Sequence, residues 1–178
     1  MKKFLQFASF IACALGLVAF VLLMVTPAIK NTVTVLGSTT VTTYAGMAAL
    51  FAGGQVVSRS GSTTLSTAFD GKAAPVALIA WILLLVAILA MVVSFLLPLL
   101  KVKVDAKILS LVALCGAILL LVAGILLFFT LPSFAKANEW SSTDNTNLAF
   151  GWVLSAILAL VGAVIGVLPS VLALVKKK

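Results

Sequence analysis

The side chains that could carry out chemistry are few and stand apart from one another. The chain has no histidine, two cysteines and four acidic residues. Enzymes that use metals or acid–base catalysis need histidines or paired carboxylates that reach the same substrate. Asp70, Glu139 and Asp144 are isolated in polar segments, where a solvated carboxylate is the usual role. We therefore predict that the protein is not an enzyme and has no catalytic, metal or cofactor site.

Both cysteines fall inside long apolar stretches of the sequence. Cys13 and Cys115 are surrounded by alanine, leucine and glycine residues. A thiol inside an apolar helix is usually a small packing residue. The polar segments contain no cysteine that could form a disulfide there. We expect packing roles for both thiols.

Four apolar stretches must position whatever surface the protein uses, and each of them ends at a proline. They cover residues 4–27, 76–98, 108–132 and 150–169. About 20 helical residues cross the hydrocarbon core of a bilayer. We predict an all-α integral membrane protein, a four-helix transmembrane bundle in one domain over residues 1–178. The run at 4–27 exceeds the roughly 7–15 apolar residues of a signal peptide, so we expect a retained span.

The interiors of these stretches contain no Asp, Glu, Lys, Arg or His. Ionisable groups within the membrane are typical of proton relays, ion-coupled transporters and voltage sensors. Their absence from the spans argues against a pump or a coupled transporter.

Lysines gather where three segments would meet on one side of the membrane. Lys2 and Lys3 precede the first stretch, three lysines lie in the turn at 101–107, and three more occupy 176–178. Loops rich in lysine and arginine usually stay in the cytoplasm. We therefore predict a plasma membrane protein with both termini and the 101–107 turn in the cytoplasm. The segments 30–74 and 133–149 would then be extracellular.

The net charge of +8 also bears on partners. The cations flank apolar stretches and have no interleaved aromatic residues. Attraction to anionic membrane lipid, about 1 kcal/mol for each cation, explains them better than binding to nucleic acid. We expect membrane lipid as a partner, and no nucleic acid or small-molecule substrate.

The segment 30–74 has the character of β-structure. Thr32–Val35 and Thr40–Thr42 alternate with a period of two, and Gly37–Ser38 is suited to a hairpin turn. An isolated hairpin is marginal in water, so it needs another strand, the helix ends or a neighbouring subunit. The apolar patch at 45–54 is too short to span a membrane and could form an interfacial helix, a short strand or a re-entrant segment. The residues at 58–66 could form a loop or a third weak strand.

This segment has too little polypeptide around it to bury its own apolar residues. Such a surface can extend a sheet by edge pairing or can pack on a neighbour. We identify it as the candidate interaction surface, formed by Val33, Val35, Val41, Tyr44, Leu50 and Phe51.

Small residues recur at helical spacing in the apolar stretches. Gly162 and Gly166 are four residues apart, and Gly16 follows a similar pattern in the first stretch. Small residues at this spacing let helix backbones approach closely. These three candidate packing residues could serve contacts inside one bundle or contacts between subunits.

The order of segments resembles the claudin-like four-transmembrane superfamily. The shared layout is a long first outer segment with strand character at 30–74, a short inner turn at 101–107, and a shorter outer segment at 133–149. The resemblance implies a small extracellular β-sheet above a left-handed helix bundle. It also implies roles in cell–cell barriers, paracellular pores or channel modulation. The first-segment signature of that superfamily contains tryptophans and two cysteines, which residues 30–74 lack, so no functional residue carries over.

These observations favour a non-enzymatic four-span protein that acts through contacts of its extracellular segment. We expect a homo-oligomer with a structural or adhesion role at the cell surface, and contacts with other membrane proteins are possible. Two alternatives are an oligomeric pore and an accessory subunit of another membrane complex. A polar stripe along one span would indicate a pore. The polar residues of the spans are instead scattered: Ser9, Ser94, Ser110, Thr130 and Ser155.

Overall fold

Four long helices form most of the protein in the computed structural model, which describes residues 2–102 and 104–175. They are α1 (Lys2–Val25), α3 (Pro75–Leu99), α4 (Ala106–Phe128) and α6 (Phe150–Val175). Each contains a stretch of at least 20 residues that is long and apolar enough to cross a membrane. The prediction of four such helices is confirmed.

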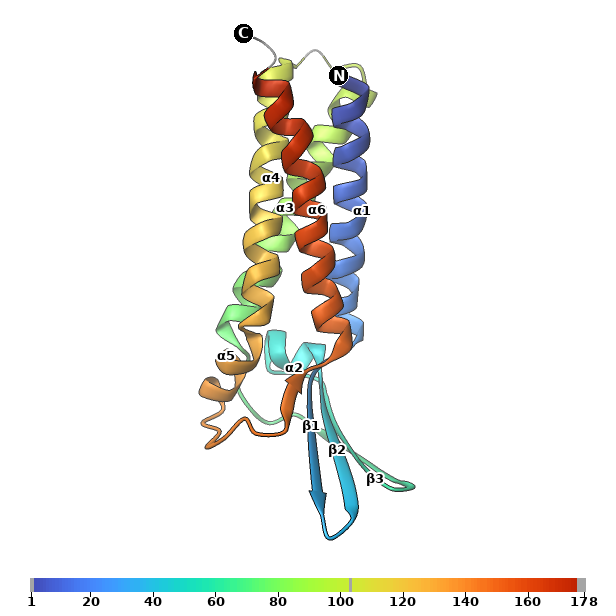
Figure 1. Ribbon diagram of the computed structural model, residues 1–178, viewed down its shortest axis with the longest axis vertical. Coiled ribbons are helices and arrows are strands. Elements are labelled where there is room, and N and C mark those ends of the chain that lie inside the picture. Colours follow the sequence, from blue (N-terminus) through green and yellow to red (C-terminus); the bar gives the residue numbers. More distant parts are fainter. Residues whose placement is uncertain (1, 103, 176–178) are drawn as a thin grey trace.

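The helices run side by side and form an antiparallel bundle (Figure 1). Helix α1 contacts α3 and α6, and α4 contacts the same two helices from the opposite corner. The start of α1, the α3–α4 turn and the end of α6 lie together at one end of the bundle. A β-sheet extends from the other end.

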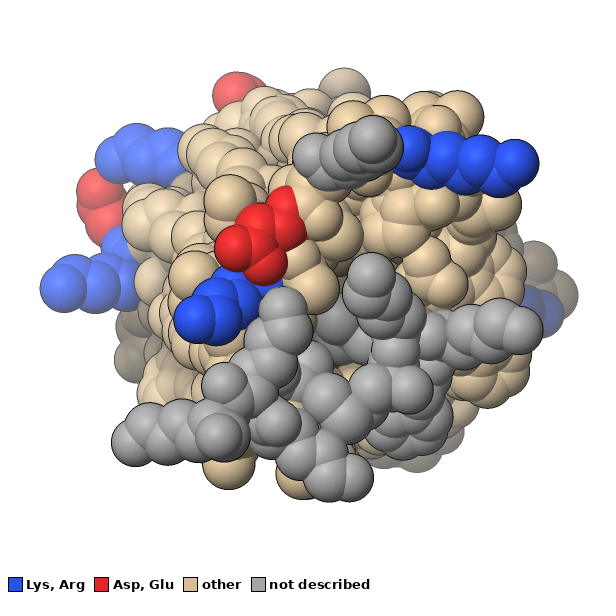
Figure 2. Space-filling model, turned by 90° about the horizontal axis from the view of Figure 1, so that it is seen from above, with Lys and Arg blue, Asp and Glu red and all other residues tan. Residues whose placement is uncertain are grey.

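The end of the bundle that lacks the sheet was predicted to be strongly cationic. Figure 2 views this end and shows basic side chains that project at its edges and an acidic side chain beside a basic one nearer the middle. Residues 103 and 176–178, which carry part of the predicted charge, lie outside the described residues. Asp105 caps α4 there and accepts a hydrogen bond from the backbone N–H of Lys107 at 3.0 Å.

The prolines mark the helix ends less closely than we predicted, although α3 ends at Leu99, one residue after Pro98. Pro98 lies inside α3, and Pro169 lies inside α6, which continues to Val175. Proline removes one backbone donor, but helices in apolar surroundings tolerate it where side chains satisfy the freed groups. The carbonyl that Pro169 leaves without a backbone donor is that of Ile165, whereas the neighbouring Ser170 hydroxyl donates to the carbonyl of Gly166 at 2.7 Å.

The other two spans end earlier than the predicted residues 27 and 132. Helix α1 ends at Val25, and Pro27 is the first residue of a strand. Helix α4 ends at Phe128 and is followed by a separate short helix, α5 (Thr130–Ala137), which contains Pro132. The chain therefore changes direction two to four residues before each proline.

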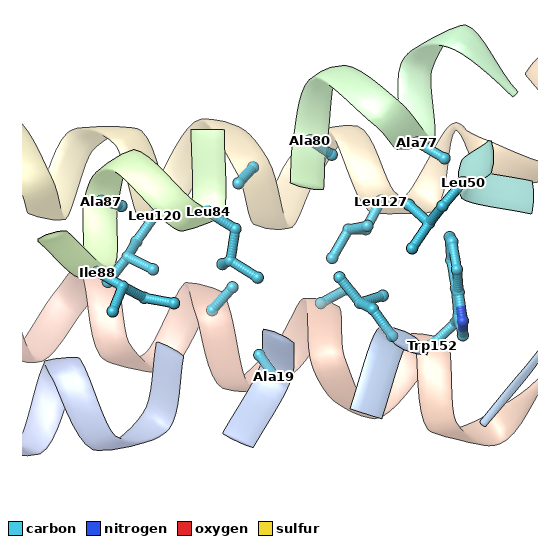
Figure 3. Packing of buried hydrophobic residues seen from close by; sticks show 14 of the residues in the cluster. Ala19, Leu50, Ala77, Ala80, Leu84, Ala87, Ile88, Leu120, Leu127 and Trp152 are labelled. Carbon is cyan, nitrogen blue, oxygen red and sulfur yellow. The ribbon is translucent and has the colours of Figure 1, made fainter. Parts of the chain in front are cut away.

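Alanines and a few large side chains fill the bundle. Figure 3 shows Ala80, Leu84 and Leu120 between the helices, and all three are fully buried. Because alanine is small, the helices approach closely. The outward surface is also apolar, and its exposed side chains include Phe10, Val18, Leu89 and Ile125.

The three candidate glycines lie at contacts inside this bundle. A Cβ atom on Gly16 would lie 3.1 Å from Ile88 of α3. On Gly166 it would lie 3.0 Å from the Cβ atom of Ala117 in α4, and on Gly162 it would lie 3.4 Å from a carbonyl of α1. These positions correspond to the first of our two interpretations, packing within one subunit.

The sheet has five antiparallel strands in the order β4-β3-β2-β1-β5. They are β1 (Pro27–Val35), β2 (Ser38–Ala45), β3 (Gln55–Ser60), β4 (Thr63–Ala68) and β5 (Thr146–Leu148). The predicted first hairpin is confirmed, but its turn is Leu36–Gly37. Val35 pairs with Ser38, and both turn residues have positive φ, 49° and 81°. That geometry is typical of a two-residue type I′ turn.

The rest of the sheet contains more strands than we predicted. Residues 58–66 belong to a second hairpin, β3–β4, instead of a loop or a single strand. The strand β5 comes from the segment at 133–149, in which we predicted no strand. The apolar patch at 45–54 contains a short helix, α2 (Gly46–Phe51), one of the three predicted possibilities.

Candidate interaction surface

An aromatic cluster fixes the base of the sheet to the bundle. The ring of Tyr44 lies 6.0 Å from Phe69, 5.5 Å from Phe134 and 5.4 Å from Trp140, centroid to centroid. Phe134 belongs to α5 and is fully buried. Burial raises the pKa of the Tyr44 phenol above its ordinary value. Tyr44, a predicted contact residue, is thus already packed within its own subunit.

Helix α2 closes the end of the bundle and takes Leu50 out of the candidate surface. Leu50 is fully buried in the same cluster as Leu127 and Trp152. Its expected role at a contact surface is therefore corrected, because no part of its side chain reaches the exterior. Phe51 is 43% exposed, and its ring packs edge-on against Trp81 at 5.2 Å.

A glycine is needed where α2 meets α1. The backbone N–H of Gly46 donates to the carbonyl of Thr26 at 3.1 Å. A Cβ atom on Gly46 would overlap the carbonyl oxygen of Leu23. The backbone N–H of Ala74 donates to the carbonyl of Ala49 at 2.8 Å on the other side of α2. Backbone hydrogen bonds thus join α2 to Thr26, which follows α1, and to Ala74, which precedes α3.

Strand register divides the sheet into two faces. Residues directly opposite each other share a face, and successive residues alternate between faces. One face carries both cations of the strands, Lys30 and Arg59, and we call it the basic face. It also holds Thr32, Thr34, Thr39, Val41, Thr43, Gln55, Val57, Thr64, Ser66, Ala68 and Asn147.

The other side, which we call the uncharged face, has no ionisable carboxylate or cation. Its residues are Ile29, Asn31, Val33, Val35, Ser38, Thr40, Thr42, Tyr44, Val56, Ser58, Ser60, Thr63, Leu65, Thr67, Thr146 and Leu148. Hydroxyl pairs cross its strands, for example Thr42 with Ser58 at 3.1 Å. Asn31 donates to the Thr146 hydroxyl at 2.8 Å and ties β5 to β1.

The three candidate valines therefore do not form one surface. Val33 and Val35 lie on the uncharged face and are 44% and 61% exposed. Leu65 of β4 lies on the same face and is 62% exposed. Val41 lies on the basic face opposite Arg59 and is half-buried. Leu65 was missed by the sequence analysis, although it is the only large apolar residue between 57 and 69.

The two edges of the sheet differ. Along β5, only three residues pair with β1, and they cover β1 from Ile29 to Asn31. Strand β4 pairs with β3 alone, and all six of its residues are exposed. Its sequence, TTLSTA, contains neither a charge nor a proline. One full row of backbone N–H and C=O groups is thus open to another strand.

The described part of the chain does not bring three or more His, Cys, Asp or Glu side chains together as metal ligands. Within the same residues, Cys13 is buried and Cys115 is exposed, and both are free thiols. No protein-family model matches the chain, and no curated protein is similar enough to count as a match. The arrangement described above is therefore the basis for assigning a function.

Proposed function

We propose that this chain is a non-enzymatic, membrane-spanning protein that associates with copies of itself through its β-sheet. The observation that carries the proposal is the fully exposed, uncharged edge strand β4. Natural sheets usually protect such edges with charges, prolines, bulges or a covering element. Strand β4 has neither a charge nor a proline, so pairing with a second copy would satisfy its open backbone groups.

The symmetry of that pairing follows from the antiparallel geometry. Two copies of β4 that run in opposite directions form an isologous contact, in which each strand offers the same surface. The sheet would then continue across both subunits. Leu65 lies in the middle of β4, so the two leucines would meet near the axis on the uncharged face. An exposed leucine would become buried in the contact.

The location and role of the assembly are parts of the same proposal. Four apolar helices with apolar outward surfaces support insertion in a membrane. The lysines at the α3–α4 turn favour a cytoplasmic position for the end that carries the termini. The sheet would then face the outside of a plasma membrane. A structural or adhesion role fits this placement. The resemblance in layout to the claudin-like superfamily favours the same kind of role.

No specific observation favours a pore. Ser94, Ser110 and Ser155 are buried, and each hydroxyl donates to the carbonyl four residues earlier in its own helix, at 2.8–2.9 Å. These hydroxyls are used within one subunit and do not form a polar stripe on its exterior. An accessory role likewise has no residue of its own that supports it.

A charge placed on β4 tests the proposal. In lipid nanodiscs, we expect Leu65→Lys with Thr67→Lys to convert the assembly into single subunits, because like charges would meet across the paired strands. The control is Thr39→Lys, which adds one cation on the first hairpin and the basic face, away from β4. Mass photometry should show assembly for the wild type and the control. Equal assembly in all three proteins would refute pairing through β4.

A further inference from the structure

A cavity lies at the junction of α1 with the basic face of the sheet. Its volume is about 170 Å³, and it is open on one side. Met24, Val25 and Pro27 line it from the end of α1 and the start of β1, and Thr43, Gln55 and Val57 line it from the sheet. The first wall is apolar apart from Thr26, whose hydroxyl donates to the carbonyl of Leu22 at 2.7 Å. The other presents the Gln55 amide and the Thr43 hydroxyl, which donates to the carbonyl of Val57 at 3.3 Å. A ligand that suits both walls must itself be amphipathic.

The two cations of the basic face stand beside this cavity. Lys30 is paired with Thr43, a lining residue, and Arg59 is two residues beyond Val57, another lining residue. Both cations are exposed. Among the described residues, one ion pair is formed, between Lys72 and Glu139 at 3.5 Å. Neither Lys30 nor Arg59 therefore has a carboxylate partner within that part of the chain. The basic face thus presents two unneutralised charges.

The apolar wall continues along the surface of α1. Val25 is 72% exposed, and the exposed side chains Val21 and Val18 follow it down the helix. Lys30 is three residues beyond Pro27, or about 10 Å along an extended strand. The headgroup layer of a bilayer begins where the apolar span ends and is roughly 5–8 Å thick. The cavity therefore lies at the depth of that layer, whereas the Lys30 backbone lies about 2–5 Å beyond it. The long Lys30 side chain must turn back toward the bilayer to meet a headgroup.

We propose that this cavity binds an anionic phospholipid of the leaflet on the sheet's side. The inference depends on the membrane-spanning arrangement proposed above, and it does not depend on self-association. An acyl chain lies along Val25 and Val21, and the glycerol region lies beside Thr43 and Gln55. The phosphate lies at the mouth of the cavity, where the Lys30 side chain meets it, and Arg59 attracts it from farther out. The oxygen of Gln55 accepts from the Ser66 hydroxyl at 2.9 Å, so its amide nitrogen is the group available to a lipid ester.

The test compares variants in nanodiscs made from equal parts of phosphatidylglycerol and phosphatidylcholine. Native mass spectrometry then counts the phosphatidylglycerol molecules that stay bound after release from the disc. We expect the wild type to retain phosphatidylglycerol preferentially. Lys30→Gln should reduce this retention about fivefold, and adding Arg59→Gln, which lies farther from the bilayer, should reduce it by a further, smaller factor. The matched control, Lys72→Gln with Lys136→Gln, also removes two cations and should retain as much as the wild type.

A second pair of variants tests the cavity separately from the charges. Gln55→Trp places a large ring at the exposed wall and should reduce retention of both lipids, whereas Thr34→Trp, on the same face but outside the cavity, should not. Equal losses in a test variant and its control would overturn the proposal. If the wild type assembles and Gln55→Trp loses self-association without losing lipid, the proposal is also overturned, because the cavity would then receive a second copy of the chain.

The same spectra separate this proposal from the proposed function. Subunits that remain assembled but bind no excess phosphatidylglycerol would overturn the lipid site alone. Single subunits that retain phosphatidylglycerol would overturn self-association and support the lipid site. A protein that fails to enter nanodiscs would overturn both, since both place the four helices in a bilayer.

Discussion

The helix bundle and the β-sheet differ in how completely one copy of the chain covers them. In the bundle, backbone hydrogen bonds lie within each helix, and each long helix packs against two others. In the sheet, β4 has a neighbour on one side, and its side chains are all exposed. This difference is the reason that we propose association through the sheet and not through the bundle.

The junction between these two regions should be the most sensitive point in the molecule. In Gly46→Ala, the new methyl group would overlap the carbonyl oxygen of Leu23, and a backbone atom cannot give way cheaply. We expect a loss of about 3 kcal/mol or more of stability, at the upper end of overpacking effects. Thermal unfolding in nanodiscs measures it. Gly53→Ala, whose methyl group would meet no atom within 4 Å, is the control and should unfold like the wild type.

Two leucine truncations should separate stability from assembly. Leu120→Ala leaves a cavity in the bundle and should cost about 3 kcal/mol while the surviving folded protein still assembles. Leu65→Ala removes an exposed side chain and should change the stability of the isolated subunit by less than about 0.5 kcal/mol. It should nevertheless weaken assembly.

Denaturation and mass photometry on the same samples provide both measurements. The comparison between bundle and sheet would fail if Leu120→Ala dissociated the assembly at temperatures where the subunit stays folded. It would also fail if Leu65→Ala left the concentration dependence of assembly unchanged.

Glycine substitutions in α6 sharpen the proposal that association does not occur through the bundle. A Cβ atom on Gly166 would lie 2.9 Å from Met91 and 3.0 Å from Ala117, so Gly166→Ala should cost about 1 kcal/mol. Gly162→Ala makes only ordinary contacts of 3.4 Å or more, and its better helix propensity should make it neutral or slightly stabilising. Neither variant should change the oligomeric state. A changed oligomeric state would place these glycines between subunits.

The smallest predicted effect concerns the aromatic cluster at the base of the sheet. Burial raises the pKa of Tyr44, so the folded form resists ionisation. Stability should be constant below about pH 10, the ordinary pKa of tyrosine, and should fall as the pH rises above it, because only the unfolded chain then ionises freely. Fluorescence of the neighbouring Trp140 should report the loosening. Tyr44→Phe should remove this component, and an unchanged alkaline transition in that variant would exclude Tyr44 as its cause.

The helices could be predicted from the sequence because about 20 consecutive apolar residues leave few alternatives. Their ends could not, because a proline's effect depends on the groups around it. Helix α6 continues through Pro169 to Val175, whereas Pro27 begins a strand. The first hairpin was visible in its alternating threonines and valines. Strand β5 was not, since three residues carry no period and its partner strand is more than a hundred residues away.

The division of the candidate valines between two faces of the sheet could have been predicted from the sequence. A two-residue turn pairs odd-numbered residues of β1 with even-numbered residues of β2, whether the turn is Leu36–Gly37 or Gly37–Ser38. Val33 and Val41 must then lie on opposite faces. The burial of Leu50 was not predictable in the same way. It depends on α2 folding back under the bundle, which is set by contacts between segments distant in sequence.

Cysteine cross-linking along β4 tests the central claim, that the open edge pairs with a second copy, most directly. In a background of Cys13→Ala and Cys115→Ala, single cysteines replace Thr64, Leu65, Ser66 and Thr67, and membranes are oxidised in native lipid. Opposed residues of an antiparallel pair bring Cβ atoms within disulfide range. We expect covalent dimers at β4 positions near the two-fold axis and none for Thr39→Cys. Absence of dimers at all four β4 positions, with efficient dimers at Thr39→Cys, would contradict the account.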